Sequence, residues 1–562
     1  MRTIFFHNSG VPHYVISTEG EKSTINSSFR PKRSEVEKPA VKHPFYRKNA
    51  QRLLHRILIA TGLATALALT IGCRSKPEPG TVVMVIESSP NNLDVRIGSD
   101  AQSEHIGALI FEPLVKKDDH YNLTPWLATS WEWRDPKTLV FHIRDGVHFH
   151  DGHLLTAGDV AWTIESMHNG AIVTAKGGSF ANVEKAEATD AHTCVVHMKK
   201  TDAGVLFNLS DGLSGIVPKG AGRDLGLNPD GTGPFRFVSQ VQDKDVVLDR
   251  NESYWNGAPK IARVRFDIVP DAITRALELQ KGSADIESNA LPMDTVYAMR
   301  NDPKTLTIST PGSILFYINF NVADPLLRDK RVRQAFAYAI DRPAIIASLW
   351  RGAARPADSM LPRGHWALPP ADQLPQYTYD PAKARALLDA AGYKPDSKGI
   401  RLHLTLKTST DDTARLLAAV VQEQVHDVGI DLALQQNEFA TFYADVTHGA
   451  FQIYSLRWVG VNEDPDIYRY AYATRSFPPK GANRGHFSNS RIDELIAQGE
   501  GEPDQENRRA IYVEVQKIIA DEEPTVNLWH INNTIVYSRR LTNIHPTAAG
   551  NYEFLREAQF TH

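Results

Sequence analysis

The sequence predicts a mixed α/β protein, built as one continuous folded region with several lobes. Short runs rich in Val, Ile and Phe alternate with amphipathic helical segments from about residue 81 onward, without a solenoid-type repeat. The chain has 562 residues, whereas single hydrophobic cores stop growing beyond about 250–300 residues. About three to four domain-sized units are therefore expected.

The composition is that of a globular protein with no basic surplus. Hydrophobic residues make up 42% of the chain and charged residues 23%, and the formal net charge is −4. A phosphate backbone requires an excess of Lys and Arg, which this chain does not have. We therefore expect no nucleic-acid partner.

An uncharged apolar segment lies in the N-terminal region. Residues 57–72 carry no charge, follow a group of Lys and Arg residues, and fall short of the roughly 20 residues of a spanning helix. This pattern predicts a signal peptide over residues 47–73. Residues 1–46 show no apolar periodicity, so they are either a disordered leader or the result of a start codon assigned too far upstream.

The apolar segment ends in Leu69-Thr70-Ile71-Gly72-Cys73, which resembles a bacterial lipobox. In that motif the cysteine is lipidated and becomes the mature N-terminus. The motif prefers Leu where this chain has Thr70, so simple cleavage and secretion is the alternative. Acyl chains contribute about 0.8 kcal/mol per buried CH2, and more than one chain on Cys73 would give a lasting membrane anchor.

Strands are expected where alternating or continuous apolar runs are bounded by turn residues. Cys194 lies in one of these runs and should behave there as a small hydrophobic residue. The runs cover residues 81–88, 138–145, 194–200, 235–240, 245–250, 263–269 and 314–321.

Helices are expected where capping residues flank apolar positions at helical spacing. Thr156, Asp271 and Asp380 are the expected N-caps, and the second and third helices should stop at Gly282 and Gly392. The apolar faces are Val160, Ile164 and Met167 in the first helix, Ile273, Ala276 and Leu277 in the second, and Val332, Ala335, Phe336, Ala339 and Ile340 in a further helix.

Nine motifs occur in an order that is typical of one protein family. Together they resemble the oligopeptide-, dipeptide- and nickel-binding family of ABC-transporter solute-binding proteins, over essentially the whole of residues 81–562. The motifs are IFEPLVKKDD, LTPWLATSWEW, LVFHIRDGVHFHDGHLLTAGDVAWTIESM, GTGPFRF, PDAITRALELQKGSADI, FYINFN, DKRVRQAFAYAIDR, YDPAKARALLDAAGY and DVGIDLAL.

The resemblance implies a two-lobed, periplasmic-binding-protein-like α/β fold of type II, with an extra inserted subdomain. The hinge would be crossed near Pro311 and near Thr534, which suits closure by a few backbone rotations. The implied divisions are lobe I at residues 74–113, 222–312 and 534–562, the inserted subdomain at 114–221, and lobe II at 313–533.

The resemblance also implies what the protein does and where it works. It would be a monomer without a cofactor, in the periplasm or cell envelope, that binds a peptide or a similar small solute. It would close on this solute and deliver it to an ABC permease and ATPase pair in the membrane.

The stretch from Arg457 to Asp466, RWVGVNEDPD, would face the cleft between the lobes. Peptide binders of the family resemble Trp-x-x-Asp here, and the Asp receives the ligand's ammonium, which needs a charge partner once it leaves water. This chain has Trp458, for ligand stacking or core packing, but Val461 stands in place of that Asp. Either Glu463 or Asp464 binds the ammonium in its place, or the ligand has no ammonium at this position. Asp464 before a proline also fits an ordinary turn.

A ligand carboxylate would need a cation in the cleft. Lys407 lies within one residue of an Arg of the dipeptide binders, Arg457 precedes the tryptophan, and Arg484 follows in GANRGH. The guanidinium of Arg can form two parallel hydrogen bonds to a carboxylate and is the best match for it. The alternative for each of these cations is a solvated position on the surface, without a role in binding. Asn319 and Asn321 would either form hydrogen bonds to the ligand or form them to the unpaired groups at a strand edge.

The run HFHDGH places three histidines at a spacing that resembles a metal site. Strand alternation would put His148 and His150 on one face, with His153 beyond the turn. The family carries a similar Phe-His-Asp-Gly turn whatever its ligand, so we predict a turn and no metal site.

The sequence offers no catalytic constellation. It contains no G-x-S-x-G, H-E-x-x-H or Walker sequence. We therefore expect a binding protein and not an enzyme. The alternatives are a cell-envelope hydrolase on a similar two-lobed frame, or a binder of nickel or another solute within the same family.

Overall fold

The structure is a computed structural model that describes residues 79–561, apart from 211–213 and 460–462. The chain divides into two compact units, Met1–Arg74 and Ser75–His562, and the described residues all belong to the second. The predicted signal peptide with Cys73, and the position of Val461, lie outside the described residues. Within the described ranges, no helix combines the length and apolar character needed to cross a membrane.

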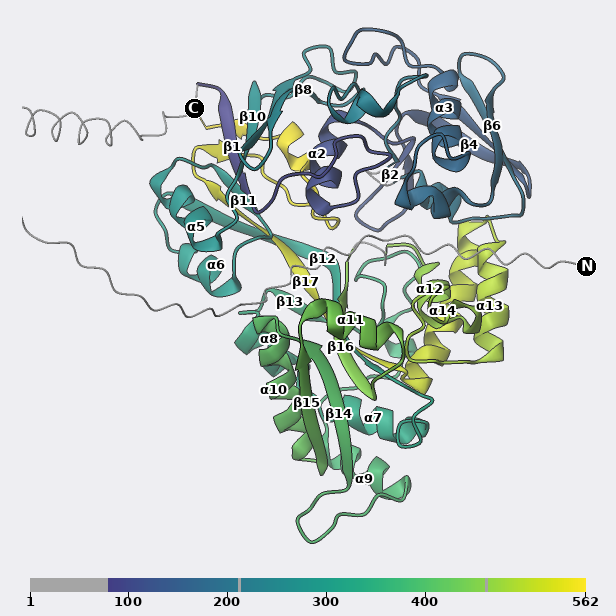
Figure 1. Ribbon diagram of the computed structural model, residues 1–562, viewed down its shortest axis with the longest axis vertical. Coiled ribbons are helices and arrows are strands. Elements are labelled where there is room, and N and C mark those ends of the chain that lie inside the picture. The colour runs from purple at the N-terminus through teal and green to yellow at the C-terminus, as the bar shows by residue number, and fades with distance from the viewer. Residues whose placement is uncertain (1–78, 211–213, 460–462, 562) are drawn as a thin grey trace, which may run out of the picture. The chain divides into compact units, whose positions relative to one another are not determined.

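The largest element is an eleven-stranded mixed sheet (Figure 1). Its strand order is β15-β14-β16-β12-β17-β11-β1-β10-β9-β8, with β13 pairing β17 from the side. All seven predicted strands are present, and the mixed α/β prediction is confirmed. The strands are β1 (Thr81–Ile86), β8 (Phe235–Val241), β9 (Asp245–Arg250), β10 (Arg263–Ile268), β11 (Ile286–Ser288), β12 (Thr305–Phe320), β13 (Ala354–Pro356), β14 (Leu402–Ser409), β15 (Ile430–Asn437), β16 (Ile453–Trp458) and β17 (Thr525–Ser538).

Strands β12 and β17 join the two halves of this sheet. They pair antiparallel from Thr305↔Ser538 to Asn319↔Thr525, with an irregularity between Pro311 and Leu315. One end of the pair borders β11, the other borders β16, and each half has its own buried core. The predicted hinge positions fall inside these two strands. The exact limits predicted for the lobes and the subdomain stay a prediction.

A smaller antiparallel sheet, in the order β4-β5-β7-β6, packs against α3 around a third core. Cys194 is fully buried in β7 within that core, and burial raises the pKa of its thiol to about 12, so the thiolate is disfavoured. The elements are β4 (Ala128–Asp135), β5 (Thr138–Ile143), β6 (Val183–Ala188), β7 (Thr193–Met198) and α3 (Ala157–His168), beside the hairpin of β2 (Val115–Lys117) and β3 (Leu123–Pro125).

Helices cover the sheet and fill the space beyond its edges (Figure 1). A final two-stranded sheet of β18 (Leu541–Thr542) and β19 (Gln559–Phe560) follows β17. The helices are α2 (Ala101–Ile110), α4 (Val205–Asn208), α5 (Ala272–Lys281), α6 (Met293–Met299), α7 (Lys330–Tyr338), α8 (Arg342–Leu349), α9 (Pro381–Ala390), α10 (Asp412–His426), α11 (Phe439–Thr447), α12 (Ile467–Tyr472), α13 (Ser490–Glu500) and α14 (Gln505–Glu522).

The predicted helix ends are confirmed. Thr156 and Asp159 form a capping box, Asp271 and Asp380 cap α5 and α9 with their carboxylates, and Gly282 ends α5 at φ 80°.

One predicted helix face is wrong. In α5, Ala276 is buried as predicted, but Ile273 and Leu277 are 68% and 45% exposed, and the helix buries Arg275 and Leu279 in their place. Arg275 donates to the carbonyls of Val269, Pro270 and Ala290, so a polar anchor decides which side of α5 faces inward.

Candidate functional site

A cavity of about 510 Å³ lies between the segment around β2 and α4 and the segment around α12 and α13. This volume is within the range of about 300–1,000 Å³ that is typical of small-molecule sites. The lining mixes charged, amide and aromatic side chains, including Lys117, Asn182, Phe207, Glu463, Asp464 and Tyr470.

Glu463, which the sequence suggested as an ammonium receptor, is already paired. Its carboxylate accepts from Lys117 Nζ at 2.6 Å and from Ser313 Oγ at 3.1 Å. The side chain of Glu463 is 9% exposed and that of Lys117 is 19% exposed. Because Lys117 lies in β2 and Glu463 follows β16, this ion pair connects the two walls of the cavity.

Asp464 forms a bidentate ion pair with Arg508 of α14, at 2.9 and 2.8 Å. Arg508 is also held by the carbonyl of Gly499 at 3.2 Å, and its side chain is only 4% exposed. Asp464 Oδ1 further accepts from the backbone N–H of Asp466 at 2.7 Å. This geometry favours the turn interpretation of Asp464, while a ligand contact by this residue stays a prediction.

Asp466 begins α12 and pairs with Arg469 one turn later, at 2.6 Å. Burial raises the pKa of the Asp466 carboxyl to about 6, against the opposing effect of Arg469. Arg469 also lies 3.5 Å from Glu500 at the end of α13. The three acids that end the RWVGVNEDPD stretch therefore each have a cationic partner.

Two aromatic residues help to fix the acidic loop. The ring of His365 stacks on Tyr121 with centroids 5.2 Å apart. His365 Nε2 lies 3.0 Å from the carbonyl oxygen of Glu463, and Nδ1 accepts from the N–H of Ala367. Burial lowers the pKa of His365 to about 4, so the imidazole is neutral and donates through Nε2.

Trp458 ends β16 inside a cluster of tyrosines. Its ring stacks on Tyr317 at 5.7 Å and meets Tyr470 edge-on at 6.2 Å. Tyr470 in turn lines the cavity. The guanidinium carbon of Arg484 lies 5.4 Å from the Trp458 ring centroid and 5.3 Å from that of Tyr443. The structure thus brings together two predicted site residues, Trp458 and Arg484.

The other four predicted residues do not line the cavity. Lys407 pairs with Asp445 at 2.7 Å, and Arg457 is exposed. Asn321 donates to the carbonyl of Phe451 at 3.0 Å, which agrees with the strand-edge alternative. Asn319 donates to Thr525 Oγ1 at 2.8 Å, but its buried Oδ1 has no hydrogen-bond partner among the described residues. Ligand contacts by these four residues stay a prediction.

Lys117, Arg508, Arg469 and Tyr470 were not found from the sequence. The acidic partners of the three cations lie up to 346 residues away along the chain, as for Lys117 and Glu463. A weak signal existed for Arg508, because a cation at a core-facing position of an amphipathic helix requires a buried partner.

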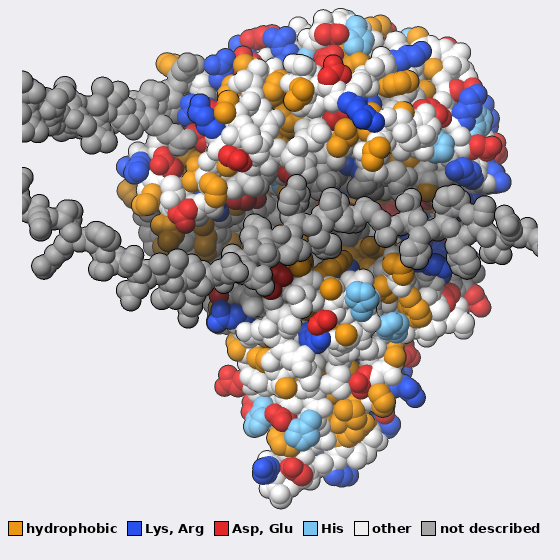
Figure 2. Space-filling model, viewed as in Figure 1, with side chains coloured by type: hydrophobic (Ala, Val, Ile, Leu, Met, Phe, Trp, Pro, Cys, Tyr) orange, Lys and Arg blue, Asp and Glu red, His pale blue; other side chains and the backbone are white. Residues whose placement is uncertain are grey.

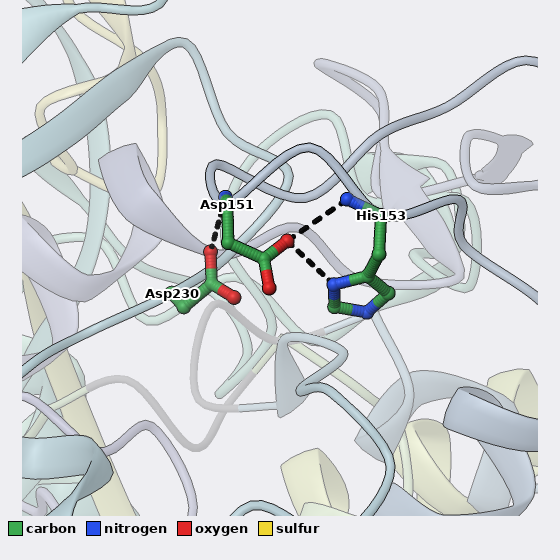
Figure 3. Close-up of side chains that lie close together, drawn as sticks. All are labelled: Asp151, His153 and Asp230. Carbon is green, nitrogen blue, oxygen red and sulfur yellow. Dashed lines mark hydrogen bonds and ion pairs between the residues drawn. The ribbon is translucent and has the colours of Figure 1, made fainter.

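The histidines of HFHDGH lie in a turn, as predicted. The turn has one isolated bridge between His148 and Leu154, and His148 and His150 bond the carbonyls of Gly146 and Gly233. The described residues do contain one group with metal-ligand proximity, Asp151, His153 and Asp230, whose ligand atoms lie within 4.8 Å of one another (Figure 3).

The surface shows mixed charge. On the face in Figure 2, Lys and Arg side chains are interspersed with Asp and Glu side chains, so that face presents no large basic patch. This agrees with the net charge of −4.

The cavity residues form a binding surface and not a reaction centre. Acid-base catalysis requires a titratable pair within hydrogen-bond reach of a substrate. His365 is instead occupied by backbone groups, and the carboxylates of Glu463 and Asp464 are occupied by cations. Two halves joined by two strands, with a polar cavity lined from separate segments, define a solute-binding protein.

Comparison with known proteins identifies the family. Residues 122–477 match the bacterial extracellular solute-binding proteins, family 5 Middle. The chain belongs to this family, whose members are binding proteins that work outside the cytoplasm. The expectation of a non-enzyme is therefore confirmed.

Relatives and solved structures agree with this assignment. The chain is 27% identical over 482 residues to the dipeptide-binding protein of Escherichia coli, covering 80% of this chain and 89% of that protein. It is 28% identical over 512 residues to heme-binding protein A of Haemophilus influenzae, covering 83% and 93%. The structure of HbpA2 from Haemophilus parasuis matches with a TM-score of 0.76 at 24% identity, covering 86% and 100%. The two-lobed fold prediction is confirmed.

Proposed function

We propose that the protein captures a peptide or a similar small solute in the cavity between its lobes and delivers it to an ABC permease. The family match over residues 122–477 carries this proposal. The names of relatives support a peptide-sized guest, since they include dipeptide- and glutathione-binding proteins. The cavity volume of about 510 Å³ has room for such a guest.

The arrangement of β12 and β17 supports capture by closure. These two strands connect the halves of the main sheet. A few backbone rotations near Pro311 would therefore move one half relative to the other without breaking either core. Lys117 and Glu463 lie on opposite walls, so their ion pair would form as the walls approach.

We further propose export and anchoring through the N-terminal segment. The basic and apolar pattern over residues 47–73 supports a signal peptide, and Cys73 would carry the lipid. An anchored binding protein stays close to its permease, which raises the local concentration of the loaded form.

The test uses the full chain expressed in a bacterial host and purified without denaturation. Native mass spectrometry should reveal a bound small solute or a mixture of solutes. A library of short peptides should then raise the melting temperature of solute-free protein, because a ligand that binds only the folded state stabilises it. A cavity that is always empty, with no melting shift across the library, would overturn the proposal.

A further inference from the structure

We propose that Arg484 is the anion receptor of the ligand site and takes a carboxylate of the solute. The proposal rests on the function proposed above and names the ligand chemistry that the site selects. It also assigns no ammonium-binding task to the acidic loop. The solute is therefore a carboxylic acid. Any amine that it carries does not bind to the acidic loop.

The first observation is the unusual environment of Arg484. The residue is 6% exposed, and its Nη1 is buried without a hydrogen-bond partner. Nη2 donates to the hydroxyl of Tyr443 at 2.9 Å. The hydroxyl of Tyr454 also hydrogen-bonds the guanidinium, and that of Tyr317 interacts with it electrostatically. No described carboxylate lies within 4.0 Å of Arg484.

Other buried arginines of the chain show what a satisfied guanidinium looks like here. Arg96 and Arg508 each hold a carboxylate with two nitrogens. Arg333 and Arg342 each donate to three or more backbone carbonyls. Arg484 has only the hydroxyls of Tyr443 and Tyr454, and its Nη1 has no hydrogen-bond partner among the described residues. A buried cation with so few acceptors is costly, and a bidentate carboxylate would satisfy it.

The second observation is the position of Arg484 beside the cavity. Its guanidinium is flanked by the rings of Trp458 and Tyr443. Trp458 contacts Tyr470, which lines the cavity, and Tyr443 is 39% exposed. Arg484 does not itself line the cavity, but Trp458 connects it to the cavity wall through Tyr470.

The third observation is the charge balance of the loop opposite. Glu463, Asp464 and Asp466 are paired with Lys117, Arg508 and Arg469. An ammonium brought to this loop would compete with cations that are already in place. A carboxylate brought to Arg484 meets a guanidinium that lacks an anion. The site therefore selects the acid end of a solute.

The test compares three libraries of the same tripeptides on the solute-free full chain. One library is unmodified, one is N-acetylated with a free carboxylate, and one is C-terminally amidated with a free amine. We expect the first two to bind and the amides to lose about tenfold to a hundredfold in affinity, as for a lost hydrogen bond to a charged group. A set of simple organic acids distinguishes a peptide carboxylate from that of a non-peptide acid.

Variants separate a ligand role from a structural one. Arg484→Met should remove the preference for acids over amides and leave the melting temperature of solute-free protein unchanged or higher, because a buried unpaired cation becomes apolar. Arg484→Lys should restore part of the preference. Arg415→Gln changes an arginine of α10 whose side chain is 53% exposed, and this variant should bind like the wild type.

The outcomes are distinguishable. If none of the libraries or acids binds, the proposed function fails. If amides bind as well as acids, or acetylation abolishes binding, the function stands and the role of Arg484 is refuted. If Arg484→Met lowers the melting temperature strongly and keeps the preference for acids, Arg484 is only structural.

Discussion

The ion pair of Asp464 and Arg508 gives the sharpest stability prediction. Replacing Asp464 by Asn leaves the guanidinium of Arg508, whose side chain is 4% exposed, without its anion. Breaking a buried pair on one side costs about 3–5 kcal/mol. An unfolding entropy of about 2.1 cal/mol/K per residue, applied to the unit Ser75–His562, gives about 1 kcal/mol/K, so the melting temperature should fall by about 3–5 °C.

The assay is calorimetry or circular dichroism of solute-free protein, with a double variant as the control. Asp464→Leu combined with Arg508→Met replaces both charges by apolar groups, and it should lose less stability than Asp464→Asn alone. If Asp464→Asn melts like the wild type but no longer binds solute, the structural assignment of Asp464 is refuted and the residue contacts ligand.

Three further changes have definite expected outcomes. Burial raises the pKa of the Glu287 carboxyl to about 8. The protonated carboxyl therefore contributes its full stability below about pH 4.5, the ordinary pKa of Glu, and this contribution is lost as the pH rises through about 8. Glu287→Gln should melt at a higher temperature than the wild type at pH 8 but not at pH 4.5. Lys117→Met breaks the ion pair with Glu463 that connects the two walls of the cavity. It should lower the free energy of unfolding by about 2 kcal/mol and increase the radius of gyration measured by solution scattering. An unchanged radius of gyration would contradict closure by this contact. Cys73→Ala should move the protein from the membrane fraction to the soluble fraction, and retention in the membrane would contradict a lipid anchor.

Much of the fold could be predicted because its signals are local. Asp271, Asp380 and Gly282 act on backbone groups within four residues of themselves, so the sequence contains both partners of each contact. The inward face of α5 could not be predicted in this way. Ile273 and Leu277 satisfy helical periodicity, but the contacts of Arg275 to distant carbonyls decide the orientation.

The site was predictable in part for the same reason. The resemblance to a family indicated Trp458 and Arg484, and the structure places both in one cluster. The pairing of Glu463 with Lys117 joins residues 346 positions apart, and no periodicity or spacing rule reaches that far. Charge partners of this kind decide whether an acidic loop is available to a ligand, so the sequence left that question open.

The position of β17 affects how the polypeptide is made. This strand is the last of the main sheet to be translated, yet it pairs with β11, β12 and β13 in the middle of that sheet. Neither half can complete its sheet on the ribosome until Thr525–Ser538 has emerged. The main sheet is therefore completed only after nearly the whole chain has been translated.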